Sequence, residues 1–122
     1  MQKYKPLLRP ATKNWDEIEE TFLKLKQEGL DVTQMLELTT YIIKSGLSQR
    51  LYGIVSLKNL IISIYPEIDY NKETIFIEFD NVNRKWHFRY VAEPFKEPEF
   101  IRVYDEGFGV PKFKQFIDWI KW

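Results

Sequence analysis

The spacing of hydrophobic residues changes part-way along this chain, from a helical to a strand-like period. In the first part, apolar residues recur three or four positions apart in two runs, and each run ends at a glycine, which supplies a left-handed stop. We expect the first helix to begin near Asn14, a favoured capping residue. The second should begin at Asp31, with Gln34 three residues later as its capping-box partner. Two short helices joined by a turn make an αα-hairpin.

The later part of the chain favours strands. Residues 51–65 are rich in β-branched side chains and predict one or two strands. Three further runs, 72–80, 85–92 and 99–104, alternate apolar and polar residues with period two. Two glycines and Pro111 then open a last helix, whose apolar residues fall on one stripe.

This order of elements predicts an α+β fold. We expect an N-terminal αα-hairpin, an antiparallel β-meander of about four strands, and a C-terminal amphipathic helix packed on the sheet. Residues 1–13 contain two prolines and no periodicity, which predicts an extended N-terminal arm. Residues 14–122 should form a single α+β domain, as the length of 122 residues favours.

The segment between the runs 72–80 and 85–92 predicts a tight hairpin around Val82–Asn83. In that register, one set of facing residues is entirely aromatic or aliphatic and should form the core face under the last helix. These pairs are Phe79 with Trp86, Ile77 with Phe88, and Ile75 with Tyr90. The basic and aromatic residues of 84–90 then belong to opposite faces of one strand and do not form a single mixed surface.

The same register predicts an outer face, with Phe76 opposite Arg89 and Glu78 opposite His87. On the next strand we expect Ile101 and Val103 to point inward, so that its alternate residues join this outer face. The predicted surface is therefore Phe76, Glu78, His87, Arg89, Phe100, Arg102 and Tyr104. Arginine and aromatic side chains are typical of the centres of protein interfaces. A solvated face with cross-strand ion pairs and a cation–π contact is the alternative.

An acidic rim is expected beside this face, because residues 93–106 carry five acidic and two basic side chains. Its carboxylates are Glu93, Glu97, Glu99, Asp105 and Glu106. Their spacing does not match a calcium-binding loop, so we predict no metal site. An acidic rim suits a basic partner by charge complementarity.

Composition and motifs restrict the chemistry. The chain has no cysteine, which excludes disulfides, cysteine nucleophiles and cysteine-based metal centres. His87 is the only histidine, and neither a nucleophile elbow nor a phosphate-binding loop is present. We therefore predict a non-enzymatic protein without a cofactor. A small enzyme that uses His87 with Glu78 is an alternative.

Charge and hydropathy bear on the partners. Lysine plus arginine and aspartate plus glutamate both number 18, and this balance argues against a protein that binds phosphate backbones. A nucleic-acid-binding accessory protein remains an alternative, since basic and aromatic residues are interleaved in 84–90. No apolar run is long enough to span a membrane, and the N-terminus lacks the apolar region of a signal peptide, so we expect a cytoplasmic protein.

In size, composition and order of elements the chain resembles the small, cysteine-free α+β immunity proteins of bacterial toxin systems. Few alanines alongside many Ile, Lys, Tyr and Asn residues are typical of AT-rich bacterial genomes. The resemblance implies a protein-binding module that neutralises a toxin or effector through an aromatic and charged surface. The predicted partner is a protein, such as a basic toxin or effector.

Overall fold

The computed structural model describes residues 12, 14–67, 72–92 and 100–122. Their elements follow in the order α1 (Trp15–Gln27), α2 (Thr33–Lys44), the short 3₁₀ helix η1 (Leu47–Gln49), β1 (Tyr52–Ser56), β2 (Asn59–Ser63), β3 (Thr74–Asp80), β4 (Lys85–Val91), β5 (Phe100–Asp105), the 3₁₀ helix η2 (Glu106–Phe108) and α3 (Gly109–Ile120). The predicted α+β class is confirmed. The described part of the sheet has five strands, because residues 51–65 fold as a two-stranded hairpin. The predicted arm lies outside the described residues, apart from Thr12.

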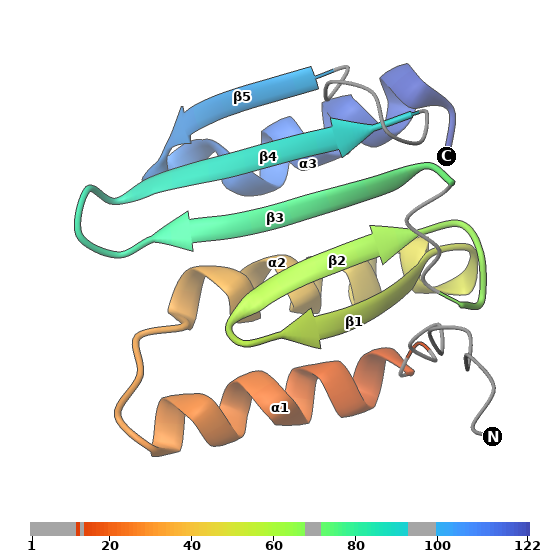
Figure 1. The fold of residues 1–122 in the computed structure, drawn as a ribbon. Helices are drawn as coiled ribbons and strands as arrows, with labels where there is room; N and C mark the ends of the chain where they lie inside the picture. Colours follow the sequence, from red (N-terminus) through yellow and green to blue (C-terminus); the bar gives the residue numbers. More distant parts are fainter. Residues whose placement is uncertain (1–11, 13, 68–71, 93–99) are drawn as a thin grey trace, which may run out of the picture.

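The five strands form one antiparallel sheet in the order β1-β2-β3-β4-β5, so every strand pairs with its neighbours in sequence. Figure 1 shows α2 behind β2 and β3, α3 behind β4 and β5, and α1 beyond the β1 edge. We call the side that faces α2 and α3 the inner face of the sheet and the opposite side the outer face.

Helix α1 is fixed to β1 through its first turn. Asn14 caps the helix as predicted, since its side-chain oxygen accepts a hydrogen bond from the Glu17 amide at 3.0 Å. The indole of Trp15 donates to the Leu51 carbonyl at 2.8 Å. A Cβ at Gly53 would lie 2.9 Å from the Trp15 ring, so only glycine allows the helix to approach the strand this closely.

The start of α2 differs from the prediction. The helix begins at Thr33, and the residue before it makes no side-chain capping bond. Asp31 accepts from the Thr33 amide at 3.4 Å, while its other oxygen forms an ion pair with the β3–β4 hairpin. Gln34 does not reach back to the helix start and instead donates to Glu106 at 3.0 Å. The predicted capping box is wrong because both side chains bond to residues distant in sequence.

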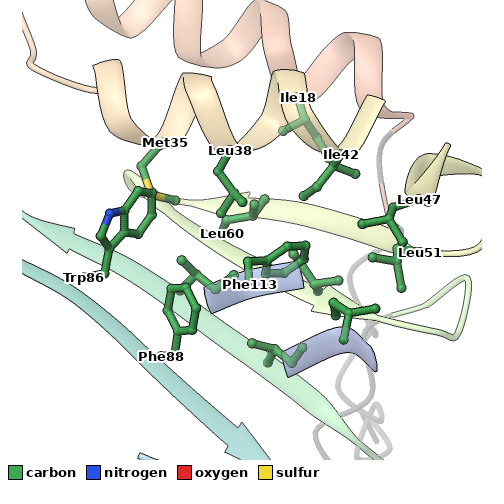
Figure 2. Packing of buried hydrophobic residues seen from close by; sticks show 14 of the residues in the cluster. Ile18, Met35, Leu38, Ile42, Leu47, Leu51, Leu60, Trp86, Phe88 and Phe113 are labelled. Carbon is green, nitrogen blue, oxygen red and sulfur yellow. The ribbon is translucent and has the colours of Figure 1, made fainter. Parts of the chain in front are cut away.

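The core lies between α1 and α2, the inner face of the sheet and α3 (Figure 2). On β4, the predicted inward residues Trp86 and Phe88 are each about 1% exposed, and Tyr90 is also buried. Phe88 meets Phe113 of α3 edge-to-face at 6.5 Å between ring centroids, and Tyr90 meets Phe116 at 5.4 Å. The predicted docking of the last helix under these aromatic residues is therefore confirmed.

The β5–α3 connection fits closely against Trp86. The indole of Trp86 donates to the Glu106 carbonyl at 2.9 Å. A Cβ at Gly109 would lie 2.1 Å from the indole ring, whereas one at Gly107 would have no neighbour within 4 Å. The first residue of α3 must therefore be glycine for the indole to be covered.

Candidate functional site: the outer face of the sheet

The β3–β4 hairpin has the predicted register, which places two predicted pairs on the outer face. Phe76 lies opposite Arg89 and Glu78 lies opposite His87. The Arg89 guanidinium stacks on the Phe76 ring at 4.3 Å, a cation–π contact. Glu78, His87 and Arg89 are all exposed. The structure thus brings together four of the predicted site residues.

The predicted orientation of β5 is wrong. Arg102 pairs with Phe88, and Phe100 and Tyr104 pair with their β4 partners on the same inner face. The outer face instead receives Ile101 and Val103, which are 57% and 53% exposed. Aliphatic residues point outward here because α3 covers the inner side of β5 with aromatic rings, and Phe100 lies 4.6 Å from Phe116 between centroids.

With this correction, the outer face carries an apolar row that crosses all five strands. Its aliphatic and aromatic members are Ile54, Ile61, which is itself buried, Phe76 and Ile101, and on β4 the row passes through Arg89, whose guanidinium stacks on Phe76. Beside it lie Glu78, His87 and Val103. A groove of about 740 Å³ runs over this surface, between Ser56 on β1 and Ile101 on β5. No described helix or strand covers the groove (Figure 1).

The groove combines few charges with one unsatisfied acceptor. The side-chain oxygen of Asn59 is buried in its wall and has no hydrogen-bond partner among the described residues. The charged groups at its floor are one carboxylate, Glu78, and one guanidinium, Arg89. The site is therefore suited to an amphipathic partner surface more than to a strongly charged one.

The predicted acidic rim is largely neutralised where the structure describes it. Asp105 forms an ion pair with Lys85, its partner across the β4–β5 ladder. Glu106 forms an ion pair with Arg84 at 2.7 Å. Glu93, Glu97 and Glu99 lie outside the described residues. Asp105 and Glu106 consequently offer little uncompensated negative charge to a basic partner.

Arg84 is a key residue that the sequence interpretation missed. It occupies a left-handed conformation in the β3–β4 turn, with φ of 56°, and its guanidinium binds Glu106 and, at 2.9 Å, Asp31. The guanidinium lowers the pKa of both carboxyl groups below their ordinary values, and it has its own pKa raised by them. These contacts join the α1–α2 loop, the β3–β4 hairpin and η2, the short helix before α3. No sequence signal identifies such contacts, because Asp31 lies far from Arg84 along the chain.

Phe100, Arg102 and Tyr104 form a different surface, on the inner side of β5. Arg102 stacks on Phe100 at 4.4 Å, and Lys112 of α3 lies 5.5 Å from the Tyr104 ring centre. Burial raises the pKa of the Tyr104 phenol, and the charge of Arg102 opposes that shift. Trp119 of α3 is 60% exposed beside Phe100. This strip is cationic and aromatic.

The catalytic alternative, His87 with Glu78, has an open setting. The two residues face each other across the β3–β4 ladder on an exposed sheet surface. No group of three or more potential metal ligands occurs within residues 12, 14–67, 72–92 and 100–122. Among these residues, no side chain forms a hydrogen bond that would orient His87 as a general base.

Comparisons with protein-family models, with curated proteins and with solved structures found no match to this chain. In the part of the chain that the structure describes, no helix is both long and apolar enough to cross a membrane. The function must therefore be argued from the surface itself.

Proposed function

We propose that this protein is a non-enzymatic protein-binding module whose contact surface is the outer face of the sheet, over β3, β4 and β5. The observation that carries the proposal is the exposure of Ile101 and Val103 on a face that no described element covers. β-Branched residues that are more than half exposed on neighbouring positions favour a contact with another molecule. Arg89, stacked on Phe76, adds the kind of side chain that dominates interface energetics.

The size of the face is compatible with such a contact. Five strands spaced about 4.8 Å apart and roughly 20 Å long present a projected area of roughly 500 Å². A stable protein interface buries about 800 Å² on each partner. The outer face can thus supply the centre of an interface, and the surroundings of the sheet must supply the remainder.

The more specific proposal is that the partner is a toxin or effector that this protein neutralises, in the manner of small bacterial immunity proteins. Its support is the α+β fold with a mixed aromatic, aliphatic and charged sheet face. Because Asp105 and Glu106 are already paired within the chain, recognition would depend on the apolar row and on Arg89 more than on an acidic rim.

The experiment begins by capturing the tagged protein from its own host, identifying the protein that accompanies it, and purifying both. Arg89→Glu and Val103→Glu should each weaken the purified complex at least tenfold, because both place a desolvated carboxylate in the contact. Lys24→Glu makes the same charge reversal as Arg89→Glu, on the exposed side of α1, and should leave the affinity within a factor of two. Growth of cells that express the partner with and without this protein then tests neutralisation.

Two results would contradict the proposal. One is that no protein accompanies the bait at micromolar concentration. The other is that both outer-face variants bind the purified partner as the unchanged protein does.

A further inference from the structure

The two edges of the sheet differ in how they are protected. At the β1 edge, α1 lies alongside the strand, and its Trp15 donates a hydrogen bond to the backbone just before β1 (Figure 1). At the β5 edge, no described element lies beyond the strand, and four of its six residues are exposed. An uncovered edge strand presents unpaired backbone donors and acceptors to a further strand.

The ladder pattern determines which backbone groups of β5 point outward. The two-residue turn between Ser56 and Asn59 makes that outer-face pair hydrogen-bonded. Along an antiparallel strand, successive residues direct their backbone N–H and C=O groups to opposite neighbours. The backbone hydrogen bonds between β2 and β3 are therefore made by inner-face residues, those between β3 and β4 by outer-face residues, and those between β4 and β5 by inner-face residues. The outer-face residues Ile101 and Val103 therefore direct their N–H and C=O groups to the open edge.

One of these outward groups already has a partner within the chain. The guanidinium of Arg102 donates to the Ile101 carbonyl at 2.8 Å. The same guanidinium stacks on Phe100 and forms no ion pair with a described residue. Arg102 thus occupies a position that the N–H of an added strand would take.

The two flanks of this edge have distinct chemistry. The outer flank is aliphatic, with Ile101 and Val103. The inner flank is cationic and aromatic, and it consists of Phe100, Arg102, Tyr104, Lys112 and Trp119. Neither of its two cations pairs with a carboxylate of the described residues.

We propose that the β5 edge binds an extended segment of the partner protein as a sixth strand, with acidic side chains on the inner flank and β-branched side chains on the outer flank. A carboxylate of the segment draws the Arg102 guanidinium away, and the freed Ile101 carbonyl accepts a backbone N–H of the segment. Strand addition of this kind takes its affinity from main-chain hydrogen bonds and its specificity from alternate side chains. The inference rests on the proposed function, because it supplies the part of the interface that the outer face lacks.

A second copy of this chain does not fit the edge as well. Symmetric pairing of β5 with another β5 would bring together two inner flanks that carry Arg102 and no acidic residue. Like charges opposite one another destabilise a strand pair. The edge therefore favours an acidic segment of a different protein.

The test uses the full protein, labelled for NMR, and short capped peptides. One peptide alternates valine and glutamate, a second alternates valine and lysine, and a third repeats the first with the amides of one edge N-methylated. The glutamate peptide should shift the Ile101 and Val103 amide resonances and slow their hydrogen exchange. The lysine peptide should bind at least tenfold more weakly, and the N-methylated peptide should not bind, because it cannot donate to the edge.

The variant Arg102→Glu should reverse the preference between the glutamate and lysine peptides, while Lys24→Glu on α1 should leave it unchanged. Equal binding of both peptides, shifts confined to other elements, no shift up to millimolar peptide, or dimerisation of the protein through β5 would each overturn the inference. If the peptides fail while Arg89→Glu still disrupts the captured complex, only the strand-addition inference fails. If the peptides bind as expected but no partner protein is captured, the proposed function fails instead.

Discussion

The two faces of the sheet carry alternate residues of the same strands but have different surroundings. On β4, Trp86 and Phe88 point inward and are almost completely buried, whereas His87 and Arg89 point outward and are exposed. The inner residues meet aromatic rings at edge-to-face angles on several sides. The outer residues meet one another across the ladder and then solvent. Packing therefore restricts the identity of the inner residues, whereas it leaves the outer residues free to vary.

The largest effect should come from truncating an inner residue next to an outer one. Phe88→Ala should lower the free energy of unfolding by about 4 kcal/mol, because it removes a fully buried ring that contacts Trp86, Tyr104 and Phe113. The adjacent Arg89→Ala should cost less than about 1 kcal/mol, the value of an exposed cation–π contact. Urea denaturation measures both. Similar losses for the two variants would contradict the assignment of faces.

A methyl group added at a buried glycine and one added at an open glycine near the start of α3 should differ in their effect on stability. Gly109→Ala should destabilise the protein by about 2–3 kcal/mol, since the new Cβ collides with the buried Trp86 ring. Gly107→Ala, two residues earlier, has open space at its Cβ and should change stability by less than about 0.5 kcal/mol. Thermal unfolding followed by tryptophan fluorescence compares them, and equal midpoints would show that the ring is not packed as described.

The Arg84 contacts predict a dependence of stability on pH. The pKa values of Asp31 and Glu106 are lowered by the guanidinium, so their contribution is present above the ordinary carboxyl range near 4 and is lost as pH falls through the lowered values. In Arg84→Gln both pKa values should return toward normal. Between about pH 5 and pH 2 the unchanged protein should thus lose stability more steeply than the variant. Parallel curves would contradict this role.

The smallest effect on stability should come from the exposed aliphatic residues. Ile101→Thr and Val103→Thr keep a β-branched side chain on β5 and should each change the free energy of unfolding by less than about 0.5 kcal/mol. Both should nevertheless weaken the captured complex several-fold, which calorimetric titration measures. A loss of stability without a loss of affinity would assign these residues to folding alone.

Local patterns in the sequence were sufficient to predict the helices and the β3–β4 register. Asn14 supplied a real cap, and the alternation in β4 separated Trp86 and Phe88 from His87 and Arg89. These features depend on neighbours in sequence or on one tight turn, which restricts the register strongly.

The orientation of β5 and the pairing of the acidic residues depend on tertiary contacts, which local sequence patterns do not reveal. Alternation in β5 defines two sets of residues but not which set faces inward, and aromatic packing from α3 reversed the expectation that Ile101 and Val103 are buried. The acidic run in 93–106 was interpreted as a free rim, but Asp105 and Glu106 are paired with cations from the β3–β4 hairpin. Such pairs are fixed only when the strand order and register are known.

The most direct test of the account is amide hydrogen exchange of the protein alone and in complex with its captured partner. If the outer face and the β5 edge form the interface, amide exchange should slow in Phe100–Asp105 and at the outer-face residues His87 and Arg89 of β4. Exchange in α1 should stay as it is in the free protein. Protection confined to α1 and α2, with β5 unchanged, would contradict the central claim.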